Sequence, residues 1–239
     1  MRLLLASRSP ARRATLVSAG VTPLVRVSHV DEDAVLAGLA RERGPFGGAS
    51  PAEEVTALAV AKRDRVVEDL LAAPLPGIPE DEPLLVVGCD SMLEIGGRMV
   101  GKPGTPEIAV QRIREMRGRT AVLWTGHAVA LVSPAAGSDR PDPDGASPAT
   151  GRTVLGADAR DASTRVVFGS MSDAEIDAYV ATGEPLRVAG SFTIDGLGGP
   201  FVRGVEGDPH SVVGISLPLL RDMAADLGVF WPDLWDLNR

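Results

Sequence analysis

Short apolar runs alternate with longer amphipathic segments along the chain, and glycine, proline or helix-capping residues separate most of them. The most compact run, Leu84–Cys89, contains only apolar residues and glycine, which is typical of a strand buried on both faces. We expect Asp90 to end this run, Ser91–Ile95 to continue as a strand, and Arg98–Val100 to return as a hairpin arm. Further strands are predicted at Leu3–Ala6, Pro23–His29, Ala121–Val132, Thr164–Phe168 and Gly190–Arg203.

Helix starts are marked by a capping residue followed by proline, by a glutamate three residues later, or by both. Ser50–Glu53 combines both features and predicts a helix from about Pro51 to Leu71. Helices are also predicted from Pro10 to about Gly20, from Pro106 to about Gly118, from Asp173 to about Gly183 and from Pro218 to Leu227. The alternation of strands and helices predicts an α/β protein, and the hairpin makes its central sheet mixed rather than purely parallel.

Residues Ser133–Ser163 are rich in Pro, Gly, Asp, Ser and Ala, and we expect a long mobile loop or insertion there. No other segment has the composition of a linker that separates two domains, and the sequence has no internal repeat. A chain of 239 residues can bury a sizeable core, either as one large domain or as two small lobes. We therefore interpret residues 1–239 as one domain with an insertion at 133–163.

The formal net charge of −8 argues against a general nucleic-acid binder, whose affinity depends on a broad basic surface. No apolar stretch approaches the ~20 residues that span a bilayer. The apolar run at the N-terminus is short and followed by arginines, unlike a signal peptide. The single cysteine, Cys89, excludes an intramolecular disulfide and is expected in the core. These features predict a cytoplasmic protein that binds neither membranes nor nucleic acid.

The N-terminal segment Ser7–Arg13 has the residues of an anion-binding turn. Ser9 is a good N-cap and Pro10 suits the first helical position, so the helix would present free backbone N–H groups. Arg12 and Arg13 follow in the first turn, where the helix dipole disfavours cations unless a ligand such as phosphate supplies negative charge. A solvated basic turn on a surface helix is the alternative that this segment alone leaves open.

Two acidic positions are candidates for metal binding or acid–base chemistry. Asp90 follows a buried strand, where open α/β sheets place ligand-binding residues, although a turn-forming aspartate is the alternative. The cluster Asp31–Asp33 follows the predicted strand Pro23–His29. It is either a solvated loop or a set of oxygen ligands for a hard cation.

Lys62 and Lys102 are the only lysines among 24 basic residues, so each position is a candidate for a required ammonium group. Lys62 borders the apolar stripe of its predicted helix and either extends to solvent or points into a cleft. Gly96–Lys102 matches the start of a P-loop, but Pro103 replaces the Ser or Thr that binds Mg²⁺. We reject the P-loop and retain Lys102 as a candidate phosphate-binding charge, with an exposed hairpin lysine as the alternative.

Together these elements suit a polyphosphate substrate chelated to a divalent metal, and their order resembles the Maf family of nucleotide pyrophosphatases. The N-terminal S-x-S-P-R-R pattern of the family resembles Ser7–Arg12. The other matching segments are Asp31–Glu32, Leu58–Lys62, Gly88–Ser91, Gly101–Pro103, Tyr179–Pro185 and Ala189–Gly190. The resemblance covers nearly the whole chain apart from Ser133–Ser163 and the C-terminal tail.

The resemblance implies hydrolysis of nucleoside triphosphates to a nucleoside monophosphate and pyrophosphate, with Mg²⁺ or Mn²⁺ as cofactor. It also implies helices flanking the central sheet, two lobes around a cleft, and an assembly that is commonly a homodimer. Asp90 matches the general base of the family, although an aspartate beside a divalent metal could equally be its ligand. The implied phosphate-binding residues are Ser7, Arg12, Arg13, Lys62 and Lys102, and the implied metal ligands are Glu32 and Asp90.

Three positions bear on the choice of base: Ala11, Ser91 and Asp195. Ala11 replaces an arginine, and Asp195 a glutamine, of the branch that acts on dTTP and UTP. Ala189–Phe192 instead matches the branch that acts on 7-methyl-GTP, but Ala11 offers no stacking face for a methylated base. Ser91 stands where the family has threonine. Aspartate accepts hydrogen bonds from guanine N–H groups, whereas glutamine also donates to pyrimidine carbonyls, so the preferred base stays open.

Two functional hypotheses follow. The first is a house-cleaning hydrolase that removes non-canonical or modified nucleoside triphosphates. The alternative is a nucleotide-binding regulator of cell division or septum formation with weak or incidental hydrolysis. A pure sensor needs the cationic turn but has no need of Glu32 and Asp90, so the acidic pair favours the enzyme.

Overall fold

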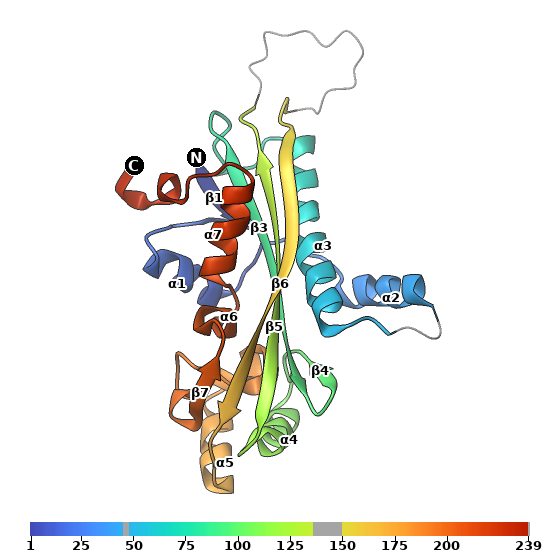
Figure 1. Ribbon diagram of the computed structural model, residues 1–239, viewed down its shortest axis with the longest axis vertical. Helices are drawn as coiled ribbons and strands as arrows, with labels where there is room; N and C mark the ends of the chain where they lie inside the picture. The colour runs from blue at the N-terminus through green and yellow to red at the C-terminus, as the bar shows by residue number, and fades with distance from the viewer. Residues whose placement is uncertain (45–47, 136–149, 239) are drawn as a thin grey trace.

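The computed structural model describes residues 1–44, 48–135 and 150–238. A seven-stranded mixed sheet forms its centre, in the order β2-β1-β3-β5-β6-β7 with β4 paired to β3 (Figure 1). The strands are β1 (Arg2–Leu5), β2 (Leu24–Val25), β3 (Leu84–Ile95), β4 (Arg98–Val100), β5 (Thr120–Val132), β6 (Val154–Phe168) and β7 (Val202–Glu206). β1 is parallel to β2 and β3, whereas the other pairs are antiparallel. The predicted α/β class and mixed sheet are confirmed.

Helices cover the sheet on both sides (Figure 1). They are α1 (Pro10–Ser18), α2 (Glu32–Arg43), α3 (Pro51–Ala72), α4 (Pro106–Met116), α5 (Asp173–Ala181), α6 (Pro209–Val213) and α7 (Leu217–Asp226). The five predicted helices are confirmed, and the capping box at the start of α3 is formed, with Ser50 Oγ accepting from the Glu53 N–H at 3.3 Å. Among the described residues, no helix is both long and apolar enough to cross a membrane.

The long strands β3 and β5 each contribute to three hydrophobic cores. One of them packs Leu84 and Val132 against α3, and the other two lie toward opposite ends of the sheet. Leu85 and Val129 pack with α7 at one end of the sheet. Leu93 and Leu123 pack with α4 and α5 at the other end. These last two cores make two lobes on one continuous sheet, and Asp90 lies on β3 between them.

Helix α3 lies unusually close to the sheet because two strand positions have no side chain. A Cβ added at Gly88 would lie 2.3 Å from the carbonyl oxygen of Ala59, and one at Gly126 would lie 2.1 Å from that of Val55. Both distances are far below van der Waals contact, so any larger residue would push the helix away. This close packing brings the middle of α3 over the middle of β3.

The predicted insertion at Ser133–Ser163 is wrong in its second part, because β6 begins at Val154. Residues 154–163 pair with β5 in antiparallel register. Their small and polar side chains give no apolar alternation, so pairing with a long partner strand decides their structure. The buried Arg152, which precedes β6, donates a hydrogen bond to the carbonyl oxygen of Ser133 at 2.8 Å. This bond connects the end of β5 with the start of β6. The part at 136–149 lies outside the described residues.

The strand predicted at Gly190–Arg203 is also wrong. It consists of turns, including two short 3₁₀ segments at Ala189–Ser191 and Gly199–Phe201, and β7 begins only at Val202. Gly190 and Ser191 have φ values of 74° and 61°, in the left-handed region that cannot continue a strand.

Three further boundaries differ from the prediction. Asp90 does not end its run, because β3 continues through it to Ile95 with Asp90 paired to Gly126. Only Leu24–Val25 of the strand expected at Pro23–His29 forms. The acidic cluster after it starts helix α2, which was not predicted, and Asp31 caps that helix by accepting from the Ala34 N–H at 3.0 Å.

Candidate active site

A cavity of about 850 Å³ lies against the middle of β3, within the size range of small-molecule sites. All of the sequence-predicted site residues except Arg13 line it, namely Ser7, Ala11, Arg12, Glu32, Lys62, Asp90, Ser91, Lys102 and Asp195. Arg13 is exposed on α1 and is not part of the lining. The structure thus gathers residues that are far apart in the chain, while the role of each residue stays a prediction.

The start of α1 forms one wall of the cavity and has the geometry expected of an anion-binding turn. Ser9 caps the helix and accepts from the Arg12 N–H at 3.4 Å, and its own N–H donates to Ser7 Oγ at 3.2 Å. No acidic residue stands in the first turn. The positive end of the helix dipole therefore faces the cavity without an internal counter-charge.

The guanidinium of Arg12 is buried, with 9% of the residue exposed. It donates to the carbonyl oxygens of Gly214 at 2.7 Å and Cys89 at 2.8 Å, and to Ser91 Oγ at 3.0 Å. No carboxylate pairs with it among the described residues. Arg12 therefore ties α1 to β3 and to the turn after α6 while its positive charge stays available to the cavity.

Lys62 points into the cavity, which decides between the two orientations left open by the sequence. Its Nζ lies 2.7 Å from Glu32 Oε1 and also donates to Asp90 Oδ1. Lys62 comes from α3, Glu32 from the first residue of α2 and Asp90 from the middle of β3. The pair of Lys62 with Asp90 is largely shielded from solvent, since their side chains are 12% and 11% exposed, whereas the Glu32 side chain is 55% exposed.

The two carboxylates around Lys62 have different proton affinities. Burial raises the pKa of Asp90, and the charges of Lys62 and Arg12 only partly offset this effect. Partial burial also raises the pKa of Glu32, but the hydrogen bond from Lys62 and the charges of Lys62 and Lys102 bring it below its ordinary value. Neighbouring acids whose environments separate their pKa values are candidates for acid–base chemistry.

Further cations surround the cavity. Lys102 lies exposed on the turn after β4, and Arg8 and Arg187 are also exposed and line the cavity. None of the three forms an ion pair within the described ranges. The sequence reasoning did not single out Arg8 or Arg187. Arg8 lies inside the N-terminal motif, whereas Arg187 ends the 3₁₀ segment Glu184–Arg187, two residues beyond the Tyr179–Pro185 motif.

His127 does not line the cavity, but it forms a hydrogen bond with backbone close to it. It is fully buried, and its Nε2 accepts from the backbone N–H of Ser216 at 2.8 Å, at the start of α7. Burial and the charge of Arg12 lower the pKa of His127 to about 4. The neutral imidazole is therefore a structural acceptor.

The predicted specificity residues lie on different elements. Ala11 is in α1, and Ser91 is on β3 with its hydroxyl engaged by Arg12 and by Thr125 Oγ1 at 3.0 Å. Asp195 is exposed on the irregular turn after the 3₁₀ segment Ala189–Ser191. Glu184, which the sequence analysis quoted only as part of a motif, also lines the cavity.

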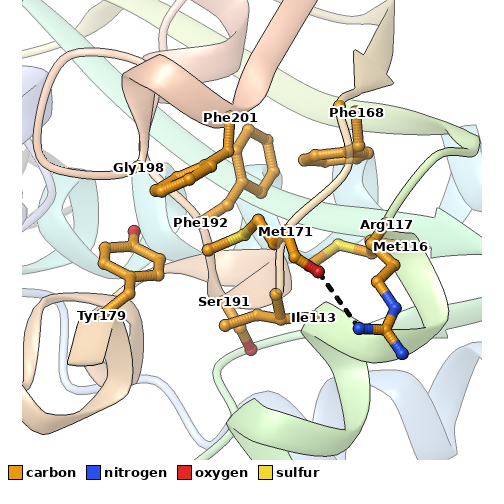
Figure 2. A pocket seen from close by; sticks show the side chains of 11 residues that line it. Ile113, Met116, Arg117, Phe168, Met171, Tyr179, Ser191, Phe192, Gly198 and Phe201 are labelled. Atoms are coloured by element: carbon orange, nitrogen blue, oxygen red, sulfur yellow. Dashed lines mark hydrogen bonds between the residues drawn. The ribbon is translucent and has the colours of Figure 1, made fainter. Parts of the chain in front are cut away.

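A second, much smaller cavity of about 20 Å³ lies against this irregular segment, which contributes Ser191, Phe192 and Gly198 to its lining (Figure 2). It is lined mainly by apolar and aromatic side chains, including Met171, Phe168 and Phe201, and Phe192 borders both cavities. Its volume corresponds to about one water molecule. It cannot hold a nucleotide, so the large cavity is the candidate active site.

Comparison with known proteins adds independent information. The family model described as Maf-like protein matches residues 2–227. A protein of Saccharopolyspora erythraea is 47% identical over 237 residues, covering 98% of this chain and 97% of that protein. One of Rhodococcus jostii is 49% identical over 232 residues, covering 97% and 94%. Both are named nucleoside triphosphate pyrophosphatase.

A longer relative has a second activity in its name. A protein of Bifidobacterium longum is 36% identical, covering 99% of this chain but 61% of that protein. It is named nucleoside triphosphate pyrophosphatase/Nudix hydrolase fusion protein.

Proposed function

The chain belongs to the Maf family, and on that premise we propose that it hydrolyses nucleoside triphosphates between the α and β phosphates. The products are a nucleoside monophosphate and pyrophosphate. The observation that carries this proposal is the Lys62 ammonium, paired with Asp90 and Glu32 in a cavity walled by an anion-binding helix start. A polyphosphate needs positioning and charge neutralisation, and this arrangement offers both.

The triphosphate is bound by the cationic side of the cavity. The Ala11 N–H at the start of α1, the Ser7 hydroxyl and the Arg12 guanidinium face phosphate oxygens. Lys62 and Lys102 supply compact charges that follow a flexible chain of phosphates. Arg13 contributes a weaker, outer contact, since it is exposed outside the lining.

Asp90 acts as the general base. Its Oδ1 is held by Lys62, and its raised pKa brings it closer to the pH at which a base is most effective. The carboxylate takes a proton from a water molecule as the water oxygen attacks the α phosphorus. The bond between this phosphorus and the bridging oxygen breaks, and pyrophosphate leaves.

Glu32 and Asp90 are suited to hold Mg²⁺ or Mn²⁺ together with the substrate. Mg²⁺ is usually bound by one or two carboxylates plus phosphate oxygens rather than by a protein cage. This pair has that composition, and no group of three or more potential metal ligands occurs in the described part of the chain. When bound, the ion neutralises charge on the phosphates.

We further propose that the enzyme is located in the cytoplasm and that two copies of the chain assemble as a homodimer.

The test is to identify the products with canonical and modified nucleoside triphosphates, in Mg²⁺ or Mn²⁺, assaying pyrophosphate and orthophosphate separately. We expect pyrophosphate as the primary product. Asp90→Asn should lower kcat by about 10³-fold, the range of a positioned general base. Asp177→Asn, at an exposed position on α5, is the matched control.

Orthophosphate as the primary product would contradict the proposal. Tight nucleotide binding without turnover by the unmodified chain would favour the regulator instead.

A further inference from the structure

The turn Thr193–Gly198 forms part of the cavity wall but contains no regular helix or strand. Thr193, Ile194, Asp195 and Gly196 line the cavity. The turn carries the carboxylate of Asp195 and no cation. A wall of this composition disfavours phosphate and suits the edge of a base that presents N–H donors.

One side chain, Glu184, organises this turn from outside it. Its Oε1 accepts from Thr193 Oγ1 at 2.5 Å and from the backbone N–H of Gly198 at 3.3 Å. Partial burial raises the pKa of Glu184. The hydrogen bonds from Thr193 and from the backbone of Leu197 and Gly198 together have the larger, opposite effect, so the pKa lies below its ordinary value. The ionised carboxylate therefore connects both ends of the turn.

Thr193 and Tyr179 complete the network. The Thr193 hydroxyl donates to Glu184 and accepts from the Gly198 N–H at 3.1 Å. The Tyr179 hydroxyl accepts from the Thr193 N–H at 3.1 Å and lies 3.2 Å from its Oγ1. In Figure 2, Tyr179 lies at one side of the small apolar cavity that Ser191 and Phe192 also line. The backbone N–H and the hydroxyl of Thr193 therefore both have hydrogen-bond partners.

The turn is also closed tightly around these groups. A Cβ added at Gly196 would lie 2.8 Å from both carboxylate oxygens of Glu184. One at Gly198 would lie 2.6 Å from the Tyr179 hydroxyl. The shape of the turn therefore depends on the length and position of the Glu184 side chain.

We propose that Glu184 is a positioning residue for base selection, which holds the Thr193–Gly198 turn so that Asp195 faces the base of the nucleotide. The inference rests on the proposed function. It also assigns the base to this side of the cavity, because most of the lining cations and the helix start that suits the triphosphate belong to the start of α1, to α3 and to the turn after β4, whereas Arg187 is the lining cation on the Glu184 side.

The experiment compares Glu184→Ala, Glu184→Gln and Thr193→Val with the unmodified enzyme. It measures kcat/KM for a panel of nucleoside triphosphates, equilibrium binding of the same nucleotides, and inhibition by inorganic tripolyphosphate. Glu184→Ala and Thr193→Val should each reduce discrimination between the best and worst nucleotides by about tenfold, as expected when a polar recognition site loses its geometry. Inhibition by tripolyphosphate should change by less than about twofold, because this probe has no base.

Glu184→Gln should keep discrimination within about threefold of the unmodified enzyme, because its amide oxygen can replace Oε1 as acceptor. Glu68→Gln is the matched control, at an exposed position on α3. Equal losses for all nucleotides together with weaker tripolyphosphate inhibition, or unchanged discrimination in both Glu184→Ala and Thr193→Val, would overturn the proposal. If the unmodified enzyme binds nucleotides but does not hydrolyse them, the proposed function fails, and discrimination in the binding measurement still decides the role of Glu184.

Discussion

The two sides of the cavity are built in different ways. On the proposed phosphate side, Arg12 lies on α1, Lys62 on α3 and Asp90 on β3, whereas Ser7 and Lys102 lie on the segments between such elements. The base side, from Glu184 to Gly198, consists of turns held together by a few side-chain hydrogen bonds. A helix or strand fixes a side chain through many shared backbone bonds, whereas a turn depends on single contacts. Changes should therefore reduce stability on the phosphate side and selectivity on the base side.

The largest effect is expected from Gly126→Ala, which tests the close contact of α3 with the sheet. Its Cβ would lie 2.1 Å from the Val55 carbonyl oxygen, so the free energy of unfolding should fall by about 3 kcal/mol or more. The Cβ of Gly196→Ala would lie 2.8 Å from the Glu184 carboxylate oxygens, which can move only by weakening their hydrogen bonds with Thr193 and Gly198, so this change should cost about 1 to 2 kcal/mol. Chemical denaturation measures both values.

Gly204→Ala is the control for this pair, because nothing lies within 4 Å of its added Cβ. Equal losses in the free energy of unfolding for Gly126→Ala and Gly196→Ala would contradict the proposed difference between the two sides of the cavity.

The next effect concerns His127 beneath the phosphate side. Its pKa is about 4 in the fold, below the ordinary value of 6.5, so it contributes stability above pH 6.5 that is lost as pH falls towards 4. The difference corresponds to about 3 kcal/mol. His127→Gln cannot titrate, so its free energy of unfolding should fall less steeply between pH 7 and pH 4.

Identical pH dependence in His127→Gln and the unmodified protein would show that His127 does not contribute.

The smallest effects separate two adjacent arginines. Arg12→Lys loses the fork that bonds Gly214, Cys89 and Ser91, so kcat/KM should fall about 100-fold for every nucleotide. Arg13→Lys should change kcat/KM by less than about threefold, because Arg13 is exposed and keeps its charge. Comparable losses in both variants would place Arg13 in direct contact with substrate.

The phosphate side could be predicted from the sequence because its signals are local. Ser9, Pro10 and the apolar run before Asp90 each indicate an element and a position within it. The turn network could not be predicted, since Glu184 meets Gly198 through a conformation that no periodic pattern encodes. Likewise, the polar first half of β6 folds as a strand because β5 offers a partner along its whole length.

The continuity of β3 and β5 past the cavity also affects how substrate is admitted. Both strands cross from one lobe to the other and stay paired from Leu84 to Glu94. The two lobes are therefore joined by continuous paired strands on both sides of Asp90. Because this connection is a paired sheet, we expect turnover without a slow hinge motion between the lobes. We expect the side chains and turns at the rim of the cavity to adjust when a nucleotide binds, because they rearrange faster than whole domains.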